Sequence, residues 1–318
     1  MSLATQTQSL RSSLNYEIQE LEFGTSGQRG KVVDLTQLEV YINAVAGLEY
    51  LQSLDTSEGG IVRGEEFFFA RDLRPSSDSF VSELDGRGEI AQAIVAAIRD
   101  VGMLPLNLGK IPTPALTCYA LARGKGSAMV TGSHIPFDRN GYKFNSSKGE
   151  LLKQQEAPII AQVRKVRQKL YDQPWDQSLF NERGLFKTGH QELPEERSEA
   201  RAAWIERFTT FFKGASLGGK RLLVYQHSAV GRDILVEVLE RMSALHVDQF
   251  DFVCSVLVEH LAKQTGVSGV IFDHEEQFDR FLVHPPYLRW GNLAFVGQKS
   301  LMFFTRLSNA ANCAGLLR

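Results

Sequence analysis

Cysteine is scarce in this chain of 318 residues: only three are present, and no two of them stand in a CxxC pair. Disulfide frameworks and structural zinc sites need paired or clustered cysteines. We therefore expect neither, and because free thiols are typical of a reducing compartment we expect a cytoplasmic protein. The three are Cys118, Cys254 and Cys313.

The chain also lacks a surplus of either charge. Its 35 Lys and Arg residues nearly balance its 37 Asp and Glu residues, which gives a formal net charge of −2. A balanced chain offers no general positive field to nucleic acid or to an anionic membrane. No apolar run reaches the roughly 18 residues that a membrane-spanning helix needs. Neither nucleic acid nor a membrane is therefore expected as a partner.

The first residues show no pattern of a targeting segment. Residues 1–15 are rich in Ser, Thr and Gln, carry Arg11 as their one charge and lack the apolar core of a signal peptide. We expect a disordered tail over residues 1–18. The hydrophobic share of the whole chain is 43%, which is typical of globular proteins, and the length suggests about two domains.

Strand-like and helix-like patterns alternate over residues 19–150, which we expect to form the first domain. Residues 65–70 hold three consecutive phenylalanines and have the length of a buried strand. Residues 88–101 repeat apolar side chains at steps of three and four, as one face of a helix does, and Gly102 follows as a C-cap. Further strands are expected at 104–108 and 127–130, with a helix at 115–123. The alternation predicts an α/β fold, a layered mixed sheet with helices on both faces.

The second half of the chain is less regular. Residues 151–217 are charged and largely helical, so we expect a helical connector that packs on the first domain, with Pro158 marking a break or the true start of its first helix. Residues 218–283 begin a partial second α/β domain, and residues 284–318 stay unassigned. Within this second domain we expect strands at 221–226 and 267–272 and helices at 232–242 and 252–264. The segment between Met242 and Phe252 is too short for a further strand and loop.

An early loop, residues 23–30, suits an anion. Loops beyond the strands are where an open α/β sheet collects its ligand-binding groups. This loop contains Thr25, Ser26 and Arg29 among three glycines, so that backbone, hydroxyl and guanidinium groups could surround a phosphate. A flexible turn explains it equally well.

A second such segment, residues 71–77, places Arg71 and Arg74 before two serines at an expected helix start. This arrangement suits an anion as well. Taken alone, the segment is better explained by a helix N-cap with a salt bridge.

The most informative loop follows the strand at 127–130 and contains Ser133, His134 and Lys143. A serine nucleophile with His134 as its base would predict a hydrolase. Adjacent side chains on an extended segment point in opposite directions, however, and the GxSxG elbow of α/β-hydrolases is missing. A serine that carries a phosphoryl group fits the surrounding hydrogen-bond donors better.

Thr131–Lys143 resembles the phosphoserine loop of the α-D-phosphohexomutases, the phosphomannomutase/phosphoglucomutase family. Its order is threonine, a small residue, serine, histidine, a variable residue and proline, then asparagine, glycine, any residue and lysine. Phe23–Gly30, Arg71–Ser77 and Gly109–Leu116 resemble further motifs in family order. Tyr225–Asp233 resembles the opening of the second domain of bacterial phosphomannomutases. Ile135 stands where many members have asparagine.

The resemblance implies a mutase that exchanges phosphate between C1 and C6 of a hexose phosphate. Ser133 would carry the phosphoryl group and pass it to the sugar phosphate, so that a hexose 1,6-bisphosphate is both intermediate and activator. His134 and Lys143 would transfer protons, and Arg29 would stabilise the transferring group. The remaining phosphate-binding residues implied are Thr25, Ser26, Arg71, Arg74 and Thr131.

The resemblance also implies a magnesium ion on Ser133, held by an acidic loop in the second domain. The corresponding segment here begins at Asp273 and departs from the family pattern, because Gln277 occupies a ligand position in either register. The expected ligands are Ser133, Asp273, Glu275 and Asp279. An acidic surface turn is the alternative.

Family members have four domains, whereas this sequence ends at Arg318, so we expect a C-terminally truncated member. Two functions stay open on this basis. One is a phosphohexomutase acting on mannose or glucose phosphate. The other is a catalytically impaired relative that binds sugar phosphate or a partner. The sequence does not predict the oligomeric state.

Overall fold

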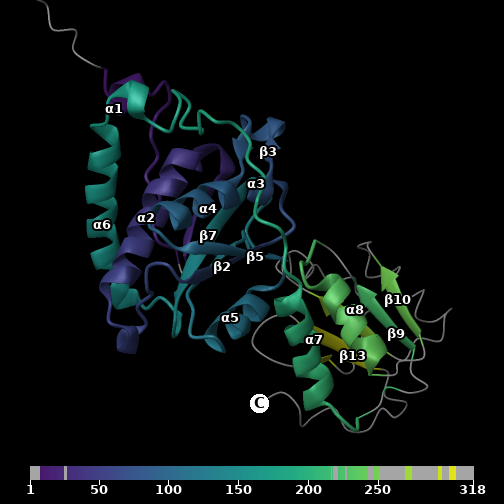
Figure 1. Cartoon of the computed structure of the whole chain (residues 1–318). Coiled ribbons are helices and arrows are strands. Elements are labelled where there is room, and N and C mark those ends of the chain that lie inside the picture. The colour runs from purple at the N-terminus through teal and green to yellow at the C-terminus, as the bar shows by residue number, and fades with distance from the viewer. Residues whose placement is uncertain are drawn as a thin grey trace, which may run out of the picture. The chain divides into compact units, whose positions relative to one another are not determined.

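The structure is a computed structural model that describes residues 8–24, 27–215, 217, 221–225, 228–242, 246–250, 269–273, 293–295 and 301–305. The chain divides into two compact units, Met1–Ala200 and Arg201–Arg318 (Figure 1). The boundary falls inside the stretch 151–217 that we expected to be one connector. Within the described residues, no helix is both long and apolar enough to cross a membrane.

The first unit is built on a mixed sheet with the strand order β1-β7-β6-β2-β5. The central strand β2 runs parallel to β5 and β6, whereas β7 runs antiparallel to β6 and β1. The short strand β8 continues from β7 as a hairpin. The bounds are β1 (Gln28–Lys31), β2 (Glu66–Arg71), β5 (Leu104–Lys110), β6 (Ser127–Val130), β7 (Arg139–Ser146) and β8 (Gly149–Glu150).

Helices cover both faces of this sheet, as the sequence predicts. The triple phenylalanine of β2 shows why, since Phe67 and Phe69 join the core cluster that α2 and α4 share, whereas Phe68 contacts Tyr119 of α5 on the other face. Helix α6 packs against the outer side of α2 (Figure 1). The helices are α2 (Gln37–Ser53), α4 (Ile90–Asp100), α5 (Thr113–Leu121) and α6 (Lys153–Tyr171).

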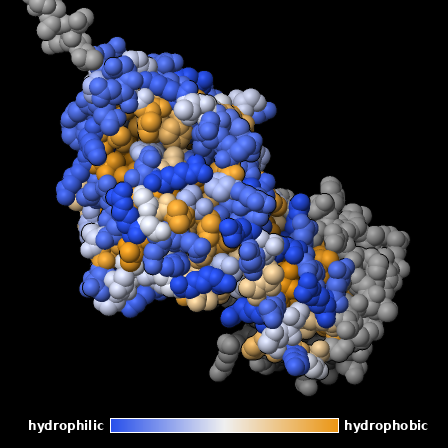
Figure 2. Space-filling view, in the orientation of Figure 1, coloured by the Kyte–Doolittle hydropathy of each residue, from blue (hydrophilic) through white to orange (hydrophobic). Residues whose placement is uncertain are grey.

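Short elements complete the first unit. Helix α3 follows β2 directly, and β3 pairs with β4 as a small hairpin. On the face that Figure 2 shows, hydrophilic residues cover most of this unit, with smaller apolar groups between them. The bounds are α1 (Leu10–Ser13), α3 (Pro75–Asp78), β3 (Phe80–Val81) and β4 (Arg87–Gly88), with 3-10 turns at Val32–Asp34, Thr56–Glu58, Ser82–Leu84 and Trp175–Gln177.

Two expectations for the first unit were wrong. Residues 9–13 are not a disordered tail, because Ser9 caps α1 and Leu10 is buried in the core, where its amide donates to the carbonyl oxygen of Gln173 (2.8 Å). Pro158 neither breaks nor begins α6, which starts at Lys153 and continues through it. Pro158 is the sixth residue of α6, beyond the first four N–H groups that have no intrahelical partner in any case, so the helix continues with one backbone hydrogen bond fewer at this point.

The second unit contains a five-stranded sheet with the order β10-β9-β11-β13-β12. Its central strands β9 and β11 run parallel, and Leu222 and Val224 of β9 pack on Val236 and Leu239 of α8. The bounds are α7 (Glu199–Phe211), β9 (Arg221–Tyr225), α8 (Arg232–Arg241), β10 (His246–Phe250), β11 (Gly269–Asp273), β12 (Leu293–Phe295) and β13 (Leu301–Thr305).

One more expectation was wrong in this unit, and one stretch that we left unassigned has regular structure. The segment after Met242 does hold a strand, since β10 pairs in parallel with β9 after only three connecting residues. Part of the unassigned stretch 284–318 also has regular structure, because β12 and β13 extend the sheet antiparallel to β11. Short strands of three to five residues give too little periodicity to be recognised. The helix expected at 252–264 lies outside the described residues.

Candidate active site

The loop that carries Ser133 begins where β6 ends. The parallel strand β2 ends beside it, so that Asp72 and Thr131 continue neighbouring strands at one edge of the sheet. The amide of Asp72 donates to the carbonyl oxygen of Val130 (2.9 Å). This edge is where an open α/β sheet places its ligand-binding groups.

Ser133 stands in the left-handed backbone region, with φ of 52°, which is uncommon for a residue other than glycine. Its amide donates to Oγ1 of Thr131 (2.9 Å), and its Oγ lies 3.4 Å from Nδ1 of His134. We expected these two neighbouring side chains to point apart. That expectation assumed an extended segment, whereas the left-handed turn brings both side chains to the same side.

A buried brace of Asp72 and Arg74 fixes this loop. The Arg74 guanidinium donates to the carbonyl oxygens of Ser133 (3.3 Å), Ile135 (2.7 Å), Pro136 (3.1 Å) and Arg139 (3.3 Å). One oxygen of Asp72 accepts from the amide of Gly132 (2.9 Å), and the other from Oγ of Ser77 (2.7 Å). A Cβ atom on Gly132 would lie 2.3 Å from Nε of Arg74. The loop is therefore wrapped around one guanidinium.

The start of β7 is held by Asn140, which is fully buried. Its Nδ2 donates to the hydroxyls of Ser76 (2.9 Å) and Ser77 (3.1 Å). The two serines of the 71–77 segment thus bind the loop. Asp72 and Asn140 lie within the motifs Arg71–Ser77 and Thr131–Lys143, which did not predict these roles. What the sequence does show is that each of these two residues is a charged or amide side chain directly at the end of a strand.

Arg71 is also fully engaged by protein groups. Its guanidinium donates to Asp78 (2.9 Å), Asn107 (3.2 Å) and Glu196 (2.5 Å), and its side chain is only 8% exposed. The salt-bridge part of the alternative explanation thus describes Arg71, whereas the N-cap part was wrong, because α3 begins after Arg74 without a side-chain cap.

Arg29 and Lys143 lie on one face of the β1–β7 pair. Arg29 is opposite Gly141, and a Cβ atom there would lie 2.8 Å from Cγ of Arg29, so the arginine side chain crosses that glycine. The carbonyl oxygen of Gly141 accepts from the amide of Thr131 (2.9 Å). Burial lowers the pKa of Arg29, which makes no ion pair with any residue that the structure describes. An anion beside it would offset that cost.

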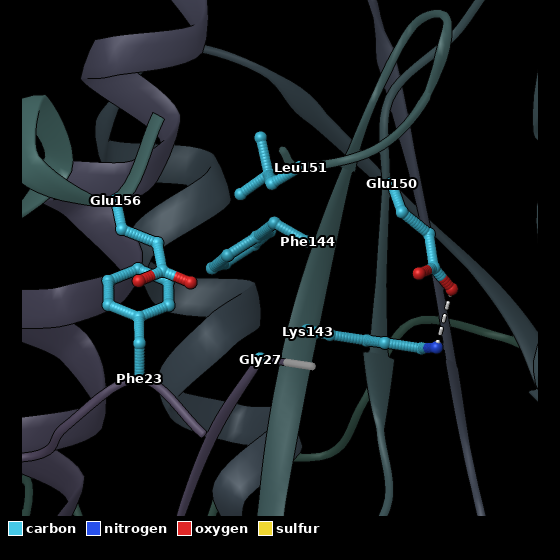
Figure 3. Close-up of a pocket in the computed structure, with 7 residues that line it drawn as sticks. All are labelled: Phe23, Gly27, Lys143, Phe144, Glu150, Leu151 and Glu156. Carbon is cyan, nitrogen blue, oxygen red and sulfur yellow. Dashed lines mark hydrogen bonds and ion pairs between the residues drawn. The ribbon is translucent and has the colours of Figure 1, made fainter. Parts of the chain in front are cut away.

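Lys143 is paired with Glu150 of β8 (Nζ to Oε1, 2.8 Å), and its side chain is 17% exposed. The two line a cavity of about 60 Å³, together with Phe23, Gly27, Phe144, Leu151 and Glu156 (Figure 3). Gly27 has φ of 75° and lies so close that a Cβ atom would meet Cβ of Lys143 at 2.6 Å. The glycine of the 23–30 loop thus makes room for the lysine.

Some of the other expected site residues lie outside the part of the chain that the structure describes. Thr25, Ser26, Glu275 and Asp279 lie outside the described residues, and only the backbone of Asp273 is described, at the end of β11. Among the described residues, no group of three His, Cys, Asp or Glu side chains could hold a metal ion. Both oxygens of Asp72 are already hydrogen-bonded, so the described residues around Ser133 do not make a magnesium site by themselves.

Comparison with known proteins identifies the first unit. Residues 20–170 match the family described as phosphoglucomutase/phosphomannomutase, alpha/beta/alpha domain I. Through this domain the chain belongs to the phosphoglucomutase/phosphomannomutase family. The resemblance and the α/β fold class expected from the sequence are thus confirmed.

Relatives of this family share up to about a third of their residues with the chain. A phosphomannomutase of Sinorhizobium fredii is 34% identical over 69% of this chain and 40% of its own length. A phosphomannomutase of Salmonella muenchen is 29% identical over 85% of this chain and 51% of its own length. A phosphoglucosamine mutase of Helicobacter pylori is 30% identical over 44% of this chain. The chain spans about half the length of the phosphomannomutases it matches.

Proposed function

We propose that Ser133 carries a phosphoryl group and that the chain performs phosphohexomutase chemistry, the interconversion of hexose 1-phosphate and hexose 6-phosphate through a hexose 1,6-bisphosphate. The observation that carries the proposal is the fixed loop around Ser133, where a strained turn presents Oγ beside His134. Phosphoryl transfer needs mainly alignment and positive charge. The loop supplies the alignment, and Arg29 and Lys143 supply the charge.

In the proposed step, the hydroxyl oxygen of a hexose phosphate attacks the phosphorus on Ser133, and the bond from phosphorus to Oγ breaks. The proton that the hydroxyl loses passes to His134, which lies within 3.4 Å of Oγ and can return it there. Lys143 is ion-paired with Glu150 and acts as a positive charge. Reversal at the other phosphate restores the phosphoserine.

Arg29 is proposed to neutralise the transferring group. Its guanidinium has no described counterion, and its side chain lies beside Gly141, whose carbonyl oxygen accepts from the amide of Thr131. Magnesium, when bound, would add positive charge on the phosphoserine oxygens, with Ser133, Asp273, Glu275 and Asp279 as ligands. That ligand set rests on the sequence resemblance, as do the phosphate-binding roles of Thr25, Ser26 and Thr131.

The substrate class follows from the relatives, which are named as mutases of mannose and glucosamine phosphates. We propose a hexose phosphate as substrate and a hexose 1,6-bisphosphate as activator, in the cytoplasm.

The test is incubation with glucose 1,6-bisphosphate followed by mass spectrometry. We expect the protein to gain one phosphoryl group on Ser133, and Ser133→Gly to gain none. Glycine is the suitable replacement because it accepts a positive φ without strain. A protein that gains no phosphoryl group, or gains it on another residue, contradicts the proposal.

A binding protein without turnover is the second candidate. It is favoured by the engagement of Arg71 and Arg74 with protein groups, which leaves two of the expected phosphate ligands occupied. Conversion of mannose 1-phosphate or glucose 1-phosphate, measured with bisphosphate present, separates the candidates. Phosphorylation of Ser133 without any conversion would favour the binding protein.

A further inference from the structure

A buried carboxylate contacts the chain just before the 23–30 loop. Glu39 of α2 is 2% exposed, and its Oε1 accepts hydrogen bonds from the amide of Leu21 (3.2 Å) and from Nδ2 of Asn43 (2.9 Å). The guanidinium of Arg167 on α6 donates to the same oxygen. Burial raises the pKa of Glu39, and these three donors oppose that shift because they favour the ionised form.

The same carboxylate reaches the other arm of the loop through Asn43. This residue lies one helical turn after Glu39 and also donates to its carbonyl oxygen (2.8 Å). Its Oδ1 accepts from Nε2 of Gln28 (2.7 Å), a residue that is only 5% exposed. Leu21 precedes the loop and Gln28 begins β1, so Glu39 is connected to both arms.

The loop between these arms closes as a tight turn. Phe23 pairs with Gln28 as an antiparallel bridge, and the amide of Gly24 donates to the carbonyl oxygen of Gly27 (2.8 Å). Leu21 and Phe23 pack against the hydrophobic core of the first unit. The position of the turn is therefore set by the groups that hold its two arms.

Arg29 directly follows the anchored Gln28. Side chains alternate between the two faces of a strand, so a Gln28 side chain that points to Asn43 places Arg29 on the opposite face. There the Arg29 side chain lies beside Gly141, at 2.8 Å between its Cγ and the Cβ position of the glycine. A slip of one residue would reverse both directions.

A polar anchor is an expensive way to hold a loop. Taking a carboxylate and a guanidinium out of water costs free energy unless they are paired and hydrogen-bonded. Apolar contacts such as those of Leu21 and Phe23 hold the arms without that cost. What a satisfied buried network adds is one defined geometry, because each donor has to meet its acceptor.

We propose that Gln28, Asn43 and Glu39 are positioning residues for Arg29. They hold β1 in the register and rotation that direct the guanidinium at the phosphoryl group being transferred. This inference rests on the proposed function, which gives Arg29 its role. The three residues act through Arg29 and do not touch the substrate.

The test is Gln28→Met, which keeps an unbranched side chain of similar length but removes the donor to Asn43. We expect the rate of Ser133 phosphorylation at saturating glucose 1,6-bisphosphate to fall about tenfold, because a small misplacement of a catalytic group lowers the rate strongly. The bisphosphate concentration for half-maximal rate should change by less than about threefold. An unchanged rate, or a change in half-saturation alone, would overturn the proposal. Should this variant fail to fold, Gln28→Asn, with an amide one methylene shorter, answers the same question.

The matched control is Gln37→Met. Gln37 is also a buried glutamine, on α2, but it donates to Oε2 of Glu89 (3.1 Å) and accepts from the amide of Phe186 (2.8 Å). Both variants lose buried hydrogen bonds, so both should melt at a lower temperature than the parent. Only Gln28→Met should slow phosphorylation. Equal slowing by the two variants would mean that Gln28 is merely structural.

A double variant tests whether Gln28 acts through Arg29. In an Arg29→Met background, the addition of Gln28→Met should slow phosphorylation by less than about twofold, since the group that it positions is already gone. A further tenfold loss would overturn the proposed route.

Hydrogen exchange of the amides of residues 21–30 keeps the two proposals apart, because it needs no phosphorylation. We expect faster exchange in Gln28→Met than in the parent, and parent-like exchange in Gln37→Met. If exchange responds in this way but Ser133 of the parent never gains a phosphoryl group, the proposed function fails and the anchor of the loop stands. If the parent is phosphorylated and Gln28→Met matches its rate, the positioning role fails alone.

Discussion

The arginines of the Ser133 region fall into two groups that the sequence does not separate. Arg71 at the end of β2 is buried, and Arg74, three residues on, has a side chain that is 9% exposed; both donate to carboxylate, amide or carbonyl oxygens of the protein. Arg29 and Arg139, on the β1–β7 face, have no described ion pair. From this difference we infer that the first group holds the structure around the loop in shape, and we propose that Arg29 of the second group binds an anion. The two groups of arginines are distinguished by the protein groups that they contact and not by their residue type.

The sharpest test of this comparison is Arg29→Met. We expect the rate of Ser133 phosphorylation by glucose 1,6-bisphosphate to fall about 10²–10³-fold, as is usual when one preorganised charge at a transition state is removed. The free energy of unfolding should change by less than about 0.5 kcal/mol, because no described partner is lost. Rapid-quench phosphorylation and urea unfolding measure the two quantities. A normal rate would place Arg29 outside the site.

The opposite pattern is expected for Arg71→Met. Removal of this buried cation leaves Asp78 and Glu196 without their partner, and we expect the free energy of unfolding to fall by about 3 kcal/mol. Arg71 also helps to lower the pKa of Asp78 against the effect of burial, so this pKa should rise in the variant, as NMR titration would show. A variant as stable as the parent but unable to bind bisphosphate would reverse the assignment.

Gly132→Ala tests the brace without touching an arginine. The added Cβ atom would overlap the Arg74 side chain, which is 9% exposed and has little room to move. We expect unfolding to become easier by about 2 kcal/mol and phosphorylation to slow as the loop shifts. Gly124→Ala is the control for adding a methyl group, because no atom lies within 4 Å of its Cβ position, although its positive φ carries a small strain of its own.

The smallest predicted effect is on stability and concerns residues 186–197, which we call the strap. Arg71 forms an ion pair with Glu196 of this segment. Near its other end, His190 donates from Nδ1 to Glu89 (2.6 Å), and the hydrogen bonds to Glu89 and then Glu192 raise the pKa of His190. The stabilisation is therefore complete below the ordinary histidine pKa of about 6.5 and is lost as the pH rises through the raised value.

Melting temperatures between pH 5 and pH 9 measure this effect. We expect the difference in melting temperature between the parent and His190→Gln to be larger at the acidic end and to vanish at the alkaline end. A difference that is constant over this range would show that the His190 pair does not titrate as described.

The sequence was sufficient for the family, for strands β2, β5 and β6 of the first unit and for the segment that carries Ser133, but it did not indicate β1, β7 or β8. These rest on local patterns, such as the triple phenylalanine of β2 and the motif of Thr131–Lys143. It was not sufficient for roles that depend on distant residues. Arg71 is engaged by Glu196, and Arg167 of α6 pairs with the buried Glu39 of α2, and neither pairing has a sequence signature.

Backbone conformation was the other source of error. The left-handed φ of Ser133 reverses the expected direction of its side chain, and nothing in its residue type announces that conformation. The buried Leu10 was missed for a related reason, because a single apolar residue in a polar stretch forms no periodic pattern. Its docking depends on Gln173, far along the chain.

The most direct measurement is a crystal structure of the protein after phosphorylation by glucose 1,6-bisphosphate. We expect a phosphoryl group on Ser133 with its oxygens within hydrogen-bond distance of the Arg29 guanidinium, while Arg71 still contacts Asp78 and Glu196 and Arg74 still contacts the loop carbonyls. A phosphoryl group held by Arg71 or Arg74 instead, with Arg29 turned away, would contradict it.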